Sequence, residues 1–299
     1  KSDPLKPFYV LLDEIQDVDG WERVVRQLHT RPNTDVYITG SNAYVLSSDL
    51  ATLIGGRYVE VRVQPLSFSE YLSFSSDVRF PNEDSAFAEY LRYGGMPALF
   101  HLKERDQDRI AQLLRTVYET IILNDVVERT KIGDVDLLSK LVRYVFTTSG
   151  SLFSANKIAN TLTSYGRKTR IETVEAYLRA LVDALILHAC EQVGLSGKDI
   201  LRPQRKFYPV DTGLRNLASG FVSGDIGFQI ENVVYNELLR RGWSVTVGSL
   251  RAGEVDFVVE RAQKRMYIQV TESLVDQGVF EREISPLLLI GDSWPKFIL

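Results

Sequence analysis

An unbroken apolar run, residues 8–12, lies close to the start of the chain and ends in two adjacent carboxylates, Asp13 and Glu14. Such a run is typical of a strand buried on both faces of a parallel sheet. A second apolar run, residues 35–38, follows a stretch, residues 21–28, whose apolar positions recur at helical spacing. The order strand, helix, strand predicts a parallel βαβ unit, in which both strands end at the same edge of the sheet.

Small polar side chains follow the second predicted strand, with Thr39, Ser41 and Asn42 close together. We expect them beside Asp13 and Glu14, because open α/β sheets bind ligands at the carboxyl ends of their strands. Taken alone, the two acids are equally typical of a solvated strand end, and Gly-Ser-Asn is ordinary turn chemistry. The pairing of the two strand ends favours a phosphate-handling ATPase site, where one acid holds Mg²⁺ and the other orients the attacking water.

A glycine pair and an arginine, Arg57, precede an alternating run, residues 58–63, which predicts another strand. Arg57 is a cation near the ligand edge of the sheet. It can neutralise phosphate charge within one subunit or across a subunit boundary, or it can pair with a surface acid. Ser67 and Glu70 have the spacing of a capping box and predict the start of a helix.

Helical periodicity dominates from residue 84 to residue 148, with residues 106–128 predicted as one long helix. The next stretch, residues 151–211, has the element order of a winged helix, in which two helices precede two strands. Its predicted elements cover residues 154–162, 171–185, 187–193 and 206–210.

Cationic side chains in the winged-helix stretch are candidate contacts for DNA or RNA, because such cations bind phosphates. They are Arg167, Lys168, Arg170, Arg202, Arg205 and Lys206. Glu172 and Glu175 lie on the exposed face of the second predicted helix, where they would repel phosphate and disfavour base-specific contacts. Nucleic-acid contact and a protein-protein or intramolecular role both remain open.

Four segments resemble, in order and spacing, the prokaryotic AAA+ ATPases that carry a poorly characterised C-terminal domain. These segments are residues 11–16 (LLDEIQ), 38–42 (ITGSN), 56–57 (GR) and 65–70 (PLSFSE). The resemblance implies an ATP site with Asp13 as the Walker B magnesium ligand and Glu14 as the catalytic base. It also implies that residues 39–42 form sensor 1, in which Thr39 and Ser41 bind the nucleotide and Asn42 takes part in catalysis. By the same resemblance, Arg57 is an arginine finger.

The Walker A loop of that family, GxxxxGK[S/T], does not occur in these 299 residues. We therefore expect a chain that does not hydrolyse ATP by itself. Because residues 294–299 also stop on an apolar, strand-like run, we expect truncation at both ends. The bound groups expected in the whole protein are ATP and Mg²⁺, and both need the missing loop.

The last segment resembles the PD-(D/E)xK nuclease core, with an acid on a helix, Glu231, and an acid on a strand, Asp256. In an active site of this kind the acids hold Mg²⁺ and a lysine polarises the attacking water. By the match, Gln269 and Thr271 take the places of the second strand acid and the lysine. Because threonine carries no positive charge, we favour a degenerate nuclease-like fold used for binding over a Mg²⁺-dependent nuclease.

The amino-acid composition restricts the class and the compartment of the protein only slightly. The chain has a net charge of -4, one cysteine and 44% hydrophobic residues. These values are ordinary for a soluble globular protein, exclude an internal disulfide framework and favour a reducing, cytoplasmic compartment. No run of about 18 apolar residues predicts a membrane span.

The predicted fold class is α/β: part of a P-loop-type AAA+ parallel sheet, then a helical and winged-helix region, then a restriction-endonuclease-like α/β domain. The predicted domains cover residues 1–75, 76–148, 149–215 and 216–299. The predicted function of the parent protein is ATP binding and hydrolysis, with homo-oligomerisation as an open option. The alternatives are a nucleic-acid-binding or cleaving effector regulated by the ATPase, and a nucleotide-dependent protein interaction scaffold.

Overall fold

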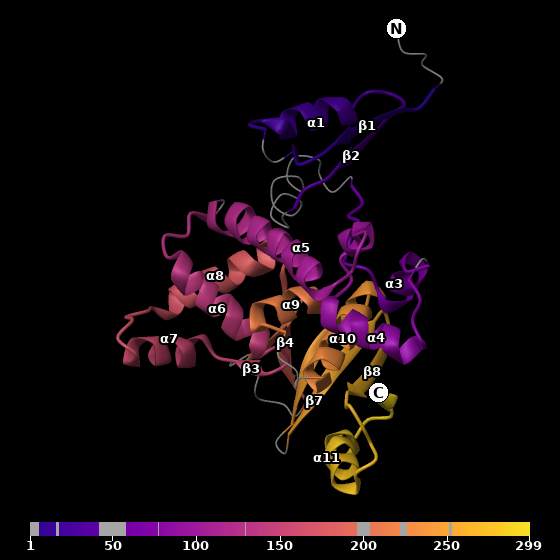
Figure 1. Ribbon diagram of the computed structural model, residues 1–299, viewed down its shortest axis with the longest axis vertical. Helices are drawn as coiled ribbons and strands as arrows, with labels where there is room; N and C mark the ends of the chain where they lie inside the picture. Colours follow the sequence, from indigo (N-terminus) through magenta and orange to yellow (C-terminus); the bar gives the residue numbers. More distant parts are fainter. Residues whose placement is uncertain are drawn as a thin grey trace.

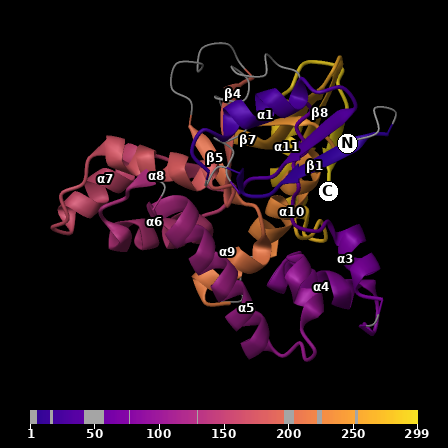
Figure 2. The ribbon, with the colours of Figure 1, turned by 90° about the horizontal axis from the view of Figure 1, so that it is seen from above.

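The computed structural model describes residues 6–15, 18–41, 58–76, 78–128, 130–195, 204–221, 226–250 and 253–299. Figure 1 shows β1, β2 and α1 at one end of the molecule and α11 at the other. Figure 2 shows α6, α7 and α8 gathered on one side, with α3 and α4 on another. Within the described ranges, every helix is too short or too polar to cross a membrane.

The N-terminal unit is the predicted βαβ arrangement. Strands β1 (Phe8–Leu12) and β2 (Thr34–Ile38) pair in parallel, and α1 (Trp21–His29) connects them. The helix buries Trp21 and Val25 against one face of this two-stranded sheet. On β1, however, Phe8 is 56% exposed and Leu11 is 77% exposed. The prediction that β1 is buried on both faces is therefore wrong for this chain, because the hydrophobic cluster of this sheet, within the described residues, lies on the side of α1.

Residues 58–64 form no strand, although the alternating pattern predicts one. Val59, Val61 and Val63 are 89%, 77% and 92% exposed. A strand requires a partner for its backbone N–H and C=O groups, and none of the described strands pairs with this segment. The apolar and polar residues do alternate here, but without a pairing strand the segment does not form a β-strand.

A bundle of helices follows. Its elements are α3 (Phe68–Phe74), α4 (Glu83–Tyr93), the 3₁₀ helix η3 (Pro97–His101), α5 (Gln107–Thr120), the π-helix η4 (Ile121–Glu128) and α6 (Val135–Thr147). The predicted capping box is confirmed: Glu70 N donates to Ser67 Oγ at 3.2 Å, and Ser67 N donates to Glu70 Oε2 at 2.8 Å. The long helix predicted over residues 106–128 changes from α to π geometry at Ile121.

The C-terminal part is built on one seven-stranded sheet in the order β3-β5-β4-β6-β7-β8-β9. Its first elements are β3 (Leu152–Phe153), α7 (Ala155–Ser164), α8 (Ile171–Asp183), β4 (Leu187–Gly194) and β5 (Arg205–Pro209). After α9 (Thr212–Ser219), the remaining elements are α10 (Ile226–Arg240), β6 (Ser244–Leu250), β7 (Gly253–Arg261), β8 (Lys264–Gln269), α11 (Gln277–Leu288) and β9 (Lys296–Ile298). The end of β4 pairs in parallel with β6, so the two-helix unit and the last segment share one sheet.

The glycine pair before η3 closes the bundle onto α9. Asp211, the N-cap of α9, is 3% exposed and accepts hydrogen bonds from Gly95 N at 2.7 Å and from Leu214 N at 3.0 Å. Gly94 has a φ of +77°, and a Cβ there would lie 2.1 Å from Asp211 Oδ1. Burial raises the pKa of Asp211 to about 6, against the opposing effect of the backbone donors. Close approach to this carboxylate therefore explains why the chain needs glycine here.

Candidate functional site

The carboxyl ends of β1 and β2 carry a connected set of polar groups. Thr39 Oγ1 donates a hydrogen bond to Asp13 Oδ1 and accepts one from Glu14 N at 3.2 Å. Thr39 N donates to Leu12 O at 2.9 Å, which continues the parallel ladder by one bond. One threonine therefore bonds to the Asp13 carboxylate and to the Glu14 backbone just after β1, and the proximity expected from the βαβ order is present in the structure.

Glu14 adopts a φ of 45°, in the left-handed region that non-glycine residues occupy infrequently. Such backbone outliers persist where the surroundings fix them, and they concentrate at functional sites. Here the N–H of Glu14 is held by the Thr39 hydroxyl. Both Asp13 and Glu14 are exposed to solvent, so their carboxylates are accessible to a ligand.

The oxygen atoms at the carboxyl ends of β1 and β2 suit a Mg²⁺ ion that is bound together with a phosphate-bearing substrate. Magnesium keeps several waters and takes one or two protein carboxylates together with substrate phosphates, and Asp13 is a carboxylate of this kind. Within the described ranges, no group of three or more His, Cys, Asp and Glu side chains is arranged to hold a metal ion without substrate. Asn42 and Arg57, the other two residues predicted to act in catalysis, lie outside the described residues.

Ser41, the last described residue after β2, turns toward the helical bundle. Its Oγ donates a hydrogen bond of 2.8 Å to Oδ1 of Asp125 in η4. The sequence pattern gave no reason to pair these residues, which are 84 positions apart. Asp125 is thus a residue of this edge that sequence reasoning missed.

A second cluster lies under the seven-stranded sheet and is centred on Lys206 of β5. Lys206 is 1% exposed, and its Nζ lies 3.2 Å from Glu231 Oε1, 2.7 Å from Glu254 Oε1 and 3.7 Å from Asp256 Oδ1. The prediction that Lys206 contacts nucleic acid is therefore wrong. A buried ammonium held by three carboxylates cannot reach a phosphate backbone.

The backbone of β7 explains how these acids meet. Between β6 and β7 the register shifts, so that Asp256 and Phe257 both stand opposite Val247. This β-bulge re-aims the side chain of Asp256, whose Oδ2 accepts a hydrogen bond from Val270 N at 2.9 Å. From α10, Glu231 accepts a hydrogen bond of 2.6 Å from the hydroxyl of Tyr208. The predicted pair Glu231 and Asp256 is thus brought together, with a lysine that the sequence pattern placed elsewhere.

Burial controls the ionisation of this cluster. It raises the pKa of Asp256 to about 7, the Glu231 carboxylate adds to that shift, and Lys206 opposes it. Burial also raises the pKa of Glu231, with Lys206 again opposing. The neighbouring carboxylates outweigh the burial of Lys206, so its pKa is raised and it stays protonated. One permanent cation therefore compensates acids that share a low-dielectric space.

The other two predicted residues of this cluster behave differently. Gln269 is 7% exposed; its Oε1 accepts from Asp256 N at 3.2 Å and its Nε2 donates to Glu283 Oε2 at 2.8 Å. Thr271 is partly exposed and donates to Ser273 O at 3.2 Å. Gln269 thus joins the cluster as a neutral bridge. Glu254 could have been found from the sequence, because it stands two positions before Asp256 on the same strand.

Two of the five remaining cations predicted to contact nucleic acid, Arg167 and Arg205, are paired with acids. Arg167 holds Asp134 through two hydrogen bonds of 2.5 and 2.7 Å and also pairs with Asp136. Arg205 pairs with Glu175, the acid expected to repel phosphate. Lys168 and Arg170 are exposed, and Arg202 lies outside the described residues. The cationic surface is therefore weaker than the count of lysines and arginines suggests.

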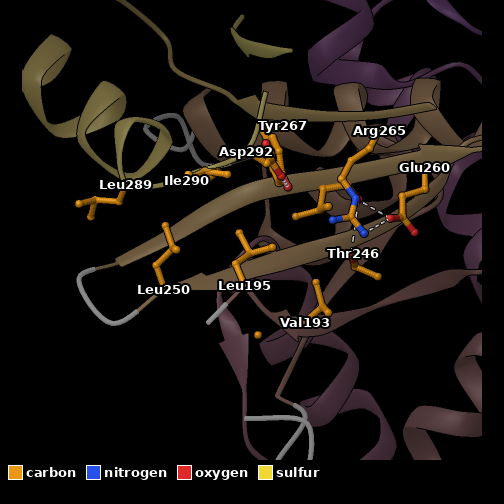
Figure 3. A pocket seen from close by; sticks show the side chains of 13 residues that line it. Val193, Leu195, Thr246, Leu250, Glu260, Arg265, Tyr267, Leu289, Ile290 and Asp292 are labelled. Atoms are coloured by element: carbon orange, nitrogen blue, oxygen red, sulfur yellow. Dashed lines mark hydrogen bonds and ion pairs between the residues drawn. The ribbon is translucent and has the colours of Figure 1, made fainter. Parts of the chain in front are cut away.

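A cavity of about 410 Å³ lies between the sheet and the segment after α11 (Figure 3). Its polar groups are satisfied within the chain: Arg265 Nε donates to Glu260 Oε1 at 2.6 Å, and the Tyr267 hydroxyl donates to Asp292 Oδ2 at 2.5 Å. The rest of the lining is mainly aliphatic. The charged side chains of this cavity are therefore paired with groups of the same cavity.

Comparison with known proteins shows which families and proteins the chain is similar to. Residues 2–72 match the family model described as "AAA domain", and residues 84–225 match a "Domain of unknown function (DUF8612)". The N-terminal region of the chain is therefore similar to an AAA domain, and the region after it is similar to that second domain. It is 37% identical over 292 residues to an "Uncharacterized protein" of Haemophilus influenzae, covering 97% of this chain and 72% of the relative. The chain belongs to the same family as that protein.

Relatives of lower sequence identity also match most of this chain. "Uncharacterized protein MJ1544" of Methanocaldococcus jannaschii is 30% identical over 287 residues, which cover 92% of this chain and 63% of the relative. Among solved structures, "The Walker-type ATPase PABY2304 of Pyrococcus abyssi" is similar, with a TM-score of 0.48 and 16% identity over 71% of this chain and 63% of that one. The chain spans about two thirds of the length of these relatives.

Proposed function

We propose that the full-length protein binds ATP and hydrolyses it with Mg²⁺ at the carboxyl ends of β1 and β2. The observation that carries this proposal is the hydrogen bonding of Thr39 to both Asp13 and Glu14. The match of residues 2–72 to an AAA domain supports it, because ATP and Mg²⁺ are general to that family.

The two acids have different roles in this proposal. Asp13 shares one carboxylate oxygen with Thr39 and would hold Mg²⁺, which neutralises charge on the phosphates. Glu14, one residue further along the edge, would orient and deprotonate the attacking water. The roles of Asn42 as a sensor 1 residue and Arg57 as an arginine finger rest on the family resemblance alone.

The phosphate cradle would come from sequence beyond these 299 residues. They contain no GxxxxGK[S/T] loop, and the Haemophilus influenzae relative is longer than the aligned region. The exposed apolar side chains of Phe8 and Leu11 on β1 suit a sheet that continues in the longer protein.

The test is ATP turnover by the full-length protein with Mg²⁺ and with excess chelator. We expect turnover only with Mg²⁺, and none from the 299-residue chain, because a chain without the phosphate cradle cannot position ATP. Absence of turnover in the full-length protein would contradict the proposal. Turnover by the 299-residue chain would contradict the assignment of the cradle to other sequence.

For the last segment we propose a nuclease-like fold that serves in binding rather than cleavage, next to a winged helix formed by α7, α8, β4 and β5. The order α10, β6, β7, β8, α11, β9 supports the nuclease resemblance, since it has the αβββαβ arrangement with β9 parallel to β8. The position of Lys206 favours a domain that binds without cleaving. Its ammonium already compensates the acids that an active site would offer to Mg²⁺.

We therefore expect no Mg²⁺-dependent cleavage of plasmid or single-stranded DNA by the full-length protein. Agarose gel analysis with Mg²⁺ or Mn²⁺ provides the measurement, and the Asp256→Ala variant is the matched control. Cleavage that disappears in this variant would overturn the binding role and establish the effector alternative.

A further inference from the structure

The hydrogen bond between Ser41 and Asp125 connects two parts of the molecule with different packing. Ser41 lies just beyond β2, whereas Asp125 belongs to η4 in the helical bundle. The two residues are 84 positions apart, so only the tertiary structure brings them together.

Asp125 is held on the bundle side by its neighbours. It is 8% exposed, and the flanking residues Ile122 and Val126 are buried in the main hydrophobic core. η4 is an eight-residue π-helix, a rare geometry that is frequent at functional sites. A buried carboxylate needs hydrogen-bond donors, and Ser41 supplies one of the interactions of Asp125. The bundle is thus a firm anchor for the end of β2.

On the other side, Ser41 lies two residues from Thr39, which bonds to both Asp13 and Glu14. A path of hydrogen bonds and two backbone links therefore runs from Asp125 to the proposed magnesium ligand and catalytic base. Proximity of this kind affects rate strongly, since small displacements of catalytic groups from their reactive geometry are costly.

We propose that Asp125 is a positioning residue for ATP hydrolysis, acting through Ser41 on the edge that holds Asp13 and Glu14. The AAA domain would then reach full activity only when η4 is docked on it. A partner or ligand that moves the bundle would thereby regulate turnover. This inference rests on the ATPase function proposed above.

The experiment measures kcat and KM for ATP in the full-length protein. In Ser41→Ala and Asp125→Ala we expect kcat to fall about tenfold, the size of one lost hydrogen bond to a charged group. KM should change little, because the phosphate cradle holds the nucleotide. Ser41→Thr and Asp125→Asn keep the donor and an acceptor, so they should retain most of the wild-type kcat.

The double variant Ser41→Ala with Asp125→Ala should be no slower than Asp125→Ala alone, because the bond that Ser41→Ala removes is already absent there. Asn124→Ala is the matched control, because Asn124 is exposed on the same π-helix. Wild-type kcat in Ser41→Ala and Asp125→Ala would overturn the inference, and so would additive losses in the double variant. A wild-type protein without turnover would instead overturn the proposed ATPase function itself.

If Asp125→Ala fails to fold, Ser41→Ala carries the test alone, because Ser41 is only partly buried. A reduced kcat in Ser41→Ala that Ser41→Thr restores supports the inference. A wild-type kcat in a folded Ser41→Ala protein contradicts it.

Discussion

Replacing Glu14 with glutamine in the full-length protein is expected to lower kcat for ATP by about 10²- to 10⁴-fold, the usual contribution of a general base. Glutamine has nearly the same shape, and the bond from the backbone N–H of residue 14 to Thr39 Oγ1 does not involve the side chain. ATP binding and the fold should therefore be preserved. Steady-state turnover and equilibrium binding of a fluorescent ATP analogue together measure both effects.

Asp19→Asn is the matched control, because Asp19 is an exposed acid just before α1 and outside the proposed site. It should keep the wild-type kcat. An E14Q protein that hydrolyses ATP at the wild-type rate would remove Glu14 from the role of base. If ATP affinity fell while kcat stayed at the wild-type value, the residue would act in binding rather than in the chemical step.

Replacing Lys206 with methionine is expected to destabilise the protein by about 3–5 kcal/mol, the cost of removing one partner from a buried ion pair. The side chain is almost the same length, so little packing is lost. Glu231 and Asp256, both 7% exposed, would lose the cation that compensates them. Chemical denaturation monitored by circular dichroism measures the change in the free energy of unfolding.

The pH dependence distinguishes electrostatics from packing. Without Lys206 the pKa of Asp256 should rise further, because Lys206 opposes the shift caused by burial. A carboxyl group whose folded-state pKa is raised favours the folded state below its unfolded pKa and loses that contribution as pH rises. The loss of unfolding free energy in Lys206→Met, relative to wild type, should therefore be larger at pH 8 than at pH 6.

Two variants complete this test. Lys264→Met changes an exposed lysine at the start of β8 and should alter stability little. Adding Asp256→Asn to Lys206→Met should recover part of the loss, because one buried carboxylate is removed. A Lys206→Met protein as stable as wild type at pH 8 would contradict the assignment of Lys206 as the compensating cation.

Local patterns predicted the elements whose causes lie in adjacent residues. The βαβ order over residues 8–38 followed from strand and helix periodicities, and the capping box at Ser67 from an acid three positions later. The strand predicted over residues 58–63 failed because strand formation depends on a partner, which periodicity does not reveal. The π geometry of η4 likewise had no signature in the apolar pattern.

The sequence by itself determined which acids stand at the ends and middle of strands: Asp13 and Glu14 after β1, and Asp256 within β7. Strand position depends on local alternation and on the residues that end an apolar run. Only the tertiary structure decided what those acids meet. Asp125 reaches Ser41, and Lys206 enters the acid cluster, because chain segments distant in sequence pack together and a buried charge must find a partner.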